Sequence, residues 1–242
     1  MLNKMTIKRP IIALDFPNRQ ATETFLNKFP AEEKLFVKVG MELFYSEGQE
    51  MVKAILAKGH DVFLDLKCHD IPHTVENTMR VIGKLGVSMT TLHASGGGEM
   101  MRAAKEGLLD GSGGNKNAKL LAITQLTSTD QKMVTEEQQV AVSLEQSVLH
   151  YARLAQTAGM DGVVCSAYEA NSILTKTSAN FLRVTPGIRL AGADVGDQKR
   201  VMTPDQAAAR KSSAIVVGRA ITQATDSVAA YRYIKEMWEE NI

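Results

Sequence analysis

The stretch Asp61–Val75, DVFLDLKCHDIPHTV, decides how this chain is interpreted. Its first half is an apolar run typical of a strand covered on both faces. Because side chains alternate along a strand, Asp65 and Lys67 point to the same face. Asp70 follows, and Pro72 is typical of the first turn of a helix, where its missing N–H has no partner to lose. We therefore expect Asp65, Lys67 and Asp70 to cluster at the C-terminal end of one strand, the end that carries the chemistry of α/β proteins.

Two simpler interpretations of these charges are weaker. Exposed Asp-x-Lys pairs are common on surfaces and contribute little stability, but this pair ends the apolar run 62–66 and needs partners there. Asp65, His69 and Asp70 carry side chains that bind metal ions, but Lys67 between them would repel a divalent cation. We therefore treat the cluster as a candidate catalytic site without a metal.

Eight apolar, strand-like runs alternate with helical segments along the 242 residues. The runs cover residues 10–16, 35–40, 62–66, 88–94, 120–126, 163–167, 181–185 and 214–217. Their number, alternation and total length predict an α/β fold, a single-domain (β/α)8 TIM barrel over residues 1–242. A doubly wound open sheet is the alternative, but no G-x-G-x-x-G motif follows the first run.

Local motifs predict where some helices begin. Two T-x-x-Q sequences, at Thr135 and Thr203, match a capping box. The first predicts a long helix that continues to Ala158, and the second predicts a helix that opens with Pro204. The run Gly96–Gly98 follows the fourth strand and predicts either a phosphate cradle or a tight strand-to-helix turn.

The composition is that of an ordinary globular protein, with a formal net charge of +1, 44% hydrophobic residues and 23% charged residues. It offers no basic surface for nucleic acid and no polybasic run for an anionic membrane, so phosphate binding must come from a local site. We interpret Cys68 and Cys165, the only two cysteines, as reduced thiols. With no signal-like N-terminal region and no apolar run of membrane-spanning length, we expect a soluble cytoplasmic protein.

The loops after the last two strands of a barrel commonly bind phosphate. Here these loops carry Arg189, Gln198, Gly218 and Arg219. Gly218 allows the backbone to approach a ligand closely, and Arg219 offers a forked cation that suits phosphate oxygens. The glycines and small residues between Arg189 and Gln198 are typical of a loop that closes over a site. The substrate is therefore expected to be a phosphate ester.

Three more polar residues end or follow other strands, namely Asp15, Lys38 and Thr127. An opposite charge close by favours the charged form, so the carboxylates of Asp65 and Asp70 would keep Lys38 and Lys67 protonated. A lysine held in that state donates a proton and does not act as a Schiff-base nucleophile. Since the sequence has no Ser-His-Asp arrangement, metal motif or nucleotide fingerprint, the charges favour protonation of a carbanion-like centre.

At these residues the chain resembles the orotidine 5′-phosphate decarboxylases of the bacterial type, whose signature D-x-K-x-x-D-I-P-x-T matches DLKCHDIPHT here. The resemblance runs along the whole chain, through Asp15, Lys38, HASGG at 93–97, LTS at 126–128, TPGIR at 185–189 and VGR at 217–219. Cys68 and His73 stand where the family often has an apolar residue and Asn, and neither position is catalytic.

The resemblance implies loss of CO2 from C6 of orotidine 5′-phosphate to give UMP, the last step of UMP (pyrimidine) biosynthesis, with no metal or organic cofactor. It implies that Lys67 protonates C6 while Asp65 and Lys38 hold it. Asp70, with Ile71 and Thr74 beside it, would come from the partner subunit of a homodimer. The other substrate-binding residues that it implies are Asp15 and Lys38 for the ribose, Thr127 and Ser128 by the pyrimidine, Gln198, Gly218 and Arg219 for the phosphate, Arg189 near the loop, and Pro186 as a further contact.

Two rival functions remain open at this point. A sugar-phosphate decarboxylase or aldolase of the same barrel group would share the Asp-x-Lys-x-x-Asp array but use Mg²⁺, and we would expect an acidic metal ligand in place of Lys38. A non-catalytic barrel that binds UMP would be expected to lack Lys67 or Asp70, and both are present.

Overall fold

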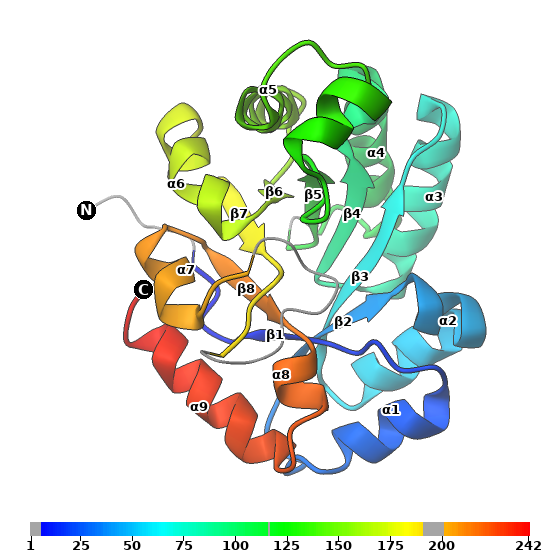
Figure 1. Ribbon diagram of the computed structural model, residues 1–242. Helices are drawn as coiled ribbons and strands as arrows, with labels where there is room; N and C mark the ends of the chain where they lie inside the picture. The colour runs from blue at the N-terminus through cyan, green and yellow to red at the C-terminus, as the bar shows by residue number, and fades with distance from the viewer. Residues whose placement is uncertain (1–5, 116, 191–200) are drawn as a thin grey trace.

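The computed structural model describes residues 6–115, 117–190 and 201–242. Within these residues, eight parallel strands form a closed barrel in which each strand pairs with the next and β8 closes on β1 (Figure 1). The strands are β1 Ile11–Ala13, β2 Phe36–Gly40, β3 Asp61–Cys68, β4 Met89–His93, β5 Lys119–Ile123, β6 Gly162–Val164, β7 Leu182–Thr185 and β8 Ala214–Val217. One strand overlaps each predicted run, so the predicted (β/α)8 TIM barrel is confirmed.

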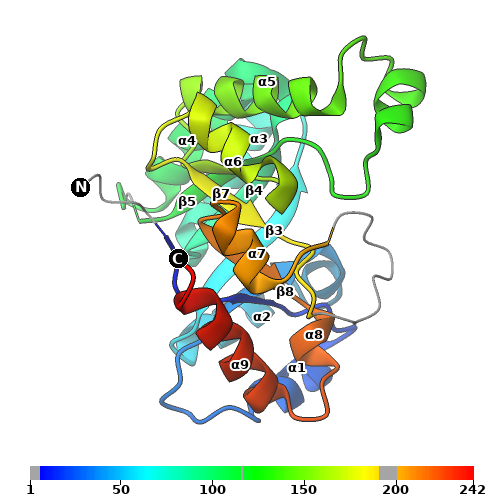
Figure 2. The same ribbon diagram turned by 60° about the vertical axis from the view of Figure 1, so that its left-hand side comes forward.

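Helices lie outside the barrel, between successive strands and after β8 (Figures 1 and 2). They are α1 Arg19–Leu26, α2 Met41–Ala57, α3 Pro72–Leu85, α4 Gly97–Gly111, α5 Leu144–Thr157, α6 Ala167–Lys176, α7 Pro204–Ala209, α8 Arg219–Thr222 and α9 Ser227–Glu239. A 3₁₀ turn, Ala94–Gly96, precedes α4, and a π-helical turn, Met133–Glu137, precedes α5. No helix in the described ranges is long and apolar enough to cross a membrane.

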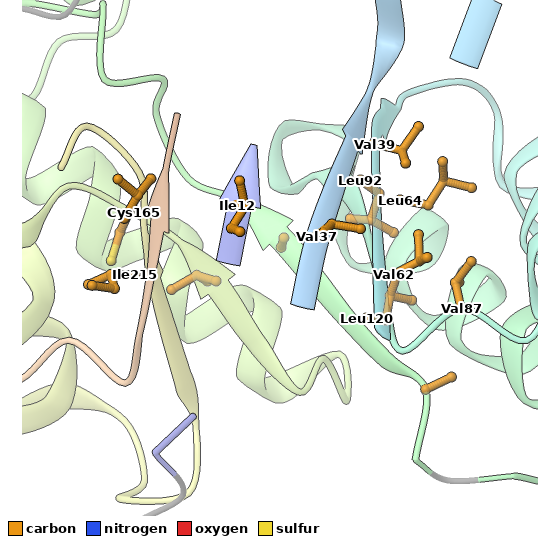
Figure 3. Packing of buried hydrophobic residues seen from close by; sticks show 14 of the residues in the cluster. Ile12, Val37, Val39, Val62, Leu64, Val87, Leu92, Leu120, Cys165 and Ile215 are labelled. Atoms are coloured by element: carbon orange, nitrogen blue, oxygen red, sulfur yellow. The ribbon is translucent and has the colours of Figure 1, made fainter. Parts of the chain in front are cut away.

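Alternating side chains build two apolar layers. Val62 and Leu64 of β3 face the outer layer between strands and helices, together with Ile12 and Val37 of the neighbouring strands (Figure 3). Phe63 belongs to the inner layer, which fills the barrel with Ile11, Phe36, Leu121, Val184 and Val216. The predicted alternation along the third strand is therefore confirmed. It directs Asp65 to the inside of the barrel, on the same face as Phe63.

Helix α3 follows the signature stretch and packs closely against α4. It begins at Pro72, as expected, and is followed by Gly86, whose φ of 80° is a left-handed conformation that glycine adopts without strain. A Cβ on Gly107 of α4 would collide with the backbone of Glu76 in α3. The missing side chain lets the two helices approach, and this packing orients the start of α3 at the mouth of the barrel.

The helix predicted to begin at Thr135 begins later, so that prediction was wrong. Thr135 lies in the π-helical turn, and α5 starts after Ser143. Ser143 Oγ accepts a hydrogen bond from the Gln146 N–H (3.1 Å), and Gln146 Oε1 accepts one from the Ser143 N–H (3.0 Å). The Gln138 side chain, expected to cap with Thr135, instead pairs with the amide of Gln125. A tertiary partner therefore outcompetes the local cap.

The other two local predictions have clear outcomes. Helix α7 begins at Pro204, and Gln206 Oε1 accepts a hydrogen bond from the Thr203 N–H (3.2 Å), as the second T-x-x-Q sequence predicts. The run Gly96–Gly98 makes a tight strand-to-helix turn, because β4 ends at His93 and α4 begins only four residues later.

Candidate active site

The C-terminal ends of the strands surround a cavity of about 660 Å³, a size typical of sites for small molecules. Ten of the predicted site residues line it: Asp15, Lys38, Asp65, Lys67, Thr127, Ser128, Pro186, Arg189, Gly218 and Arg219. The lining also includes Ala13, Phe63, Ile123, Gln125, Leu126, Val164, Cys165, Gly187, Val216 and Gln223. The cavity thus combines apolar side chains from the barrel interior with charged and hydroxyl groups from the strand ends.

Four charges of alternating sign form a chain along one wall of this cavity. Lys38 Nζ lies 3.0 Å from Asp15 Oδ1 and 3.9 Å from Asp65 Oδ2. Lys67 Nζ lies 2.9 Å from the same Asp65 oxygen. The Asp65 and Lys38 side chains are only 11% and 14% exposed, so water screens their charges weakly. Each ammonium group therefore lies beside a carboxylate of opposite charge in weakly screened surroundings.

The backbone at Lys67 explains how the ammonium returns to Asp65, two residues earlier. The register between β3 and β4 shifts between Leu64 and Cys68, and Lys67 has a φ of 52° in the left-handed region. An irregularity of this kind bends a strand locally and changes the direction of its side chains. The Lys67 N–H donates to Thr91 Oγ1 (3.0 Å), and the Thr91 hydroxyl donates to Asp65 Oδ1 (2.8 Å). Sequence reasoning missed Thr91, whose only signal is its inward position on the adjacent strand.

Asp70 does not join this cluster within one chain. Its side chain is exposed, and Oδ1 accepts a hydrogen bond from the N–H of Ile71 (2.7 Å). Ile71 is 66% exposed and Thr74 is exposed, and neither is among the described residues that line the cavity. The expectation that Asp70 clusters with Asp65 and Lys67 at one strand end is therefore wrong for the single chain. The physical reason is local: Asp70 lies beyond the end of β3, just before α3 begins at Pro72, and its carboxylate binds the neighbouring Ile71 N–H.

The predicted phosphate-binding residues that the structure describes, Gly218 and Arg219, line the same cavity as Arg189. Gly218 directly follows β8, and Arg219 begins α8. Arg189, which follows β7, is 9% exposed, and its Nη1 donates to the Ile188 carbonyl oxygen (2.9 Å). Gln198, and with it most of the predicted closing loop, lies outside the described residues.

Gln125 is another residue that sequence reasoning missed, and unlike Thr91 it lines the cavity. It lies just beyond β5, is 8% exposed, and its Nε2 donates to Gln138 Oε1 (3.0 Å) and Ser147 Oγ (3.1 Å). The pair with Gln138 ties the wall of the cavity to the segment between β5 and α5. Thr127 and Ser128, both predicted, extend the same wall.

Two histidines and two cysteines lie in or near the cavity, and their contacts are those of packed side chains. His69 and His93 stack with ring centroids 5.6 Å apart, and burial lowers the pKa of His93. Cys68 and Cys165 form no disulfide, and burial raises the pKa of the Cys68 thiol. No group of three or more His, Cys, Asp or Glu in the described parts of the chain is arranged to hold a metal ion.

Comparisons of the sequence and of the fold with known proteins identify the family of this chain. The model of the orotidine 5′-phosphate decarboxylase / HUMPS family matches residues 8–234. The orotidine 5′-phosphate decarboxylase of Ligilactobacillus salivarius is 64% identical over 236 residues, covering 98% of this chain and all of that protein. The one from Enterococcus faecalis is 56% identical over 96% of this chain and 98% of its own length. The crystal structure of orotidine 5′-phosphate decarboxylase from Lactobacillus acidophilus superposes with a TM-score of 0.86 at 42% identity, covering 95% of this chain and 98% of that one. The chain belongs to the orotidine 5′-phosphate decarboxylase / HUMPS family.

Proposed function

We propose that this chain is an orotidine 5′-phosphate decarboxylase, which converts orotidine 5′-phosphate to UMP and CO2 without a metal or organic cofactor. The observation that carries the proposal is the chain of charges from Asp15 through Lys38 and Asp65 to Lys67, in one cavity with Arg219. The reaction would supply UMP as the last step of pyrimidine biosynthesis, in the cytoplasm, by one domain spanning residues 1–242.

In the proposed mechanism the bond from C6 of the pyrimidine to the carboxylate carbon breaks, and its electron pair stays on C6. The Lys67 ammonium group donates a proton to C6 as negative charge develops there. Asp65, 2.9 Å from that ammonium, restricts its position. CO2 leaves as a neutral molecule, and Lys67 recovers its proton from water. Asp15, Lys38, Asp65 and Lys67 are already paired with one another in the absence of substrate.

The rest of the cavity supplies the binding energy. Asp15 and Lys38 would bind the ribose hydroxyls, with Thr127, Ser128 and Pro186 near the pyrimidine. The phosphate would bind Gln198, Gly218 and Arg219, with Arg189 near the closing loop. Binding energy from the phosphate, remote from C6, can be used to order the site for the transition state.

We further propose that the active enzyme is a homodimer in which Asp70 acts in the site of the partner. Support comes from Asp70 and Ile71, which are exposed and do not line their own cavity in the described residues. Large apolar side chains are also exposed after the ends of β2 and β3, namely Met41 at 45%, Tyr45 at 76% and Ile71 at 66%. A two-fold interface over this region would cover these apolar groups and carry Asp70, Ile71 and Thr74 to the other subunit.

Release of CO2 from orotidine 5′-phosphate in the presence of EDTA tests the proposal and separates it from its rivals. A decarboxylase of this kind keeps full activity in EDTA. Activity lost in EDTA and restored by Mg²⁺ would indicate the metal-dependent sugar-phosphate chemistry of the same barrel group. UMP binding without any CO2 release would indicate a nucleotide-binding protein.

A further inference from the structure

We propose that Thr91 is a positioning residue for the proposed decarboxylation, and that its hydroxyl holds Lys67 and Asp65 in their reactive arrangement. Thr91 lies in β4 and is not among the described residues that line the cavity. It therefore acts through its two neighbours and does not touch the substrate. The inference rests on the proposed function, since it concerns the orientation of the proton donor.

The first observation is the backbone conformation of Lys67. Residues with a Cβ avoid a φ of 52° because the side chain crowds the following carbonyl oxygen, and such conformations persist only where the surroundings enforce them. In the bulge at the end of β3, the Lys67 N–H is bound by Thr91 Oγ1 at 3.0 Å. The Thr91 hydroxyl is thus the partner that holds this peptide in its unfavourable conformation.

The second observation is the orientation of the Asp65 carboxylate. Its Oδ2 faces Lys67 Nζ at 2.9 Å and Lys38 Nζ at 3.9 Å, whereas its Oδ1 accepts the Thr91 O–H at 2.8 Å. Rotation of the carboxylate would break the bond to Thr91, so this bond keeps Oδ2 directed at the ammonium group. One hydroxyl therefore binds both ends of the Lys67 residue, its amide directly and its ammonium group through Asp65.

The third observation is burial. Thr91 has no exposed surface, and Asp65 is only 8% exposed. Water therefore has no direct route to replace a lost hydroxyl. Thr91→Val keeps the shape of the side chain but leaves a peptide N–H and a carboxylate oxygen without this partner. If the loss of this hydrogen-bond partner raises the activation free energy of the reaction, the rate should fall roughly ten- to a hundredfold.

The same strand provides a matched control. Thr90 is also fully buried, but it faces the helices, and its hydroxyl has no hydrogen-bond partner among the described residues. Thr90→Val therefore makes the same chemical change on the opposite face of β4. It should leave activity unchanged and should not lower the melting temperature.

The experiment measures kcat and KM for orotidine 5′-phosphate and Kd for UMP in the wild type, Thr91→Val, Thr91→Ser and Thr90→Val. We expect kcat of Thr91→Val to fall roughly ten- to a hundredfold, with KM and the UMP Kd within about threefold of wild type. Thr91→Ser, which restores the hydroxyl, should recover kcat to within about threefold. A positioning role predicts a lower kcat with little change in KM or in the Kd for UMP. A general loss of folded structure would instead lower the fraction of protein that binds UMP.

Three results would overturn the inference. One is a Thr91→Val enzyme as active as Thr90→Val, and another is a loss confined to KM. The third is a Thr91→Ser enzyme no more active than Thr91→Val. If Thr91→Val does not fold, Thr91→Ser is compared with Thr91→Ala. Both variants lack the methyl group of Thr91, and only Thr91→Ser keeps the hydroxyl. Equal kcat values for these two variants would then refute the positioning role. A wild-type protein that releases no CO2 would refute the proposed function instead.

Discussion

Lys67→Ala is the most direct test of the charged array. The substitution removes the proposed proton donor and the ion pair that Lys67 Nζ makes with Asp65 Oδ2 at 2.9 Å. At an effective dielectric constant of about 20, the gross attraction over such a distance is about 6 kcal/mol. The Lys67 side chain is 26% exposed and Lys38 still lies 3.9 Å from Asp65. Desolvation and screening therefore reduce the net contribution to about 1.5–3 kcal/mol, the range for a charged hydrogen bond.

The loss of rate should be larger than this ion pair alone explains. General acid catalysis contributes about 10²–10⁴ in rate, and the lost charged contact adds about tenfold or more, so kcat should fall by at least about 10³. UMP has no group that takes the proton from Lys67, so its Kd should stay within about threefold of wild type. Stopped assays of CO2 release and calorimetry with UMP measure the two quantities.

Lys105→Ala is a closely matched control at the other end of the barrel. Lys105 is 30% exposed and pairs with Asp161, which also lies 3.9 Å from Lys119 Nζ and accepts the Leu120 N–H at 2.8 Å. The surroundings of Asp161 thus resemble those of Asp65, and both substitutions should cost comparable stability. Only Lys67→Ala should lose activity. A Lys67→Ala enzyme within about tenfold of wild-type kcat would refute the assignment of the proton donor.

Three further predictions concern the phosphate, the shared site and pH. Arg219→Ala should weaken UMP binding roughly ten- to a hundredfold, because the phosphate loses a charge-assisted contact, and unchanged calorimetric affinity would move the phosphate elsewhere. Lys67→Ala and Asp70→Ala homodimers should both be inactive. When the two proteins are mixed and their subunits exchange at random, about half of the dimers contain one subunit of each kind, and each of these has one intact site of two. The mixture should therefore recover about a quarter of wild-type activity. Continued inactivity, with subunit exchange shown by tag pull-down, would refute the shared site. His60 Nδ1 accepts the Leu35 N–H at 3.2 Å, and burial lowers its pKa below 6.5. The contribution of neutral His60 to the free energy of unfolding should be complete above pH 6.5 and should be lost as pH falls from there through the folded-state pKa. His60→Asn keeps a hydrogen-bond acceptor but does not titrate. The free energy of unfolding of this variant, measured in urea, should therefore decline less steeply between about pH 7 and 5.

The sequence by itself determined the barrel, and it predicted many of the residues that line the candidate site. The apolar runs alternate with helical segments, and the period of two along β3 directed Asp65 inward, as the structure shows. Because parallel strands of a barrel all end at one mouth, residues that follow different strands were expected to meet, and Asp15, Lys38 and Arg219 line one cavity. These inferences succeeded because each depends on local periodicity and on the position of a residue within its own strand.

Only the tertiary structure decided the contacts between segments far apart in the chain. Thr91 binds Asp65 and Lys67 because the register between β3 and β4 shifts, and this shift depends on how two strands pair. Gln138 pairs with Gln125 instead of capping a helix, and α5 therefore starts where Ser143 can cap it. Asp70 lies in the short link between the end of β3 and the start of α3, where it is exposed and outside the lining of its own cavity. In each case local preference left several arrangements open, and packing against a neighbouring element selected one of them.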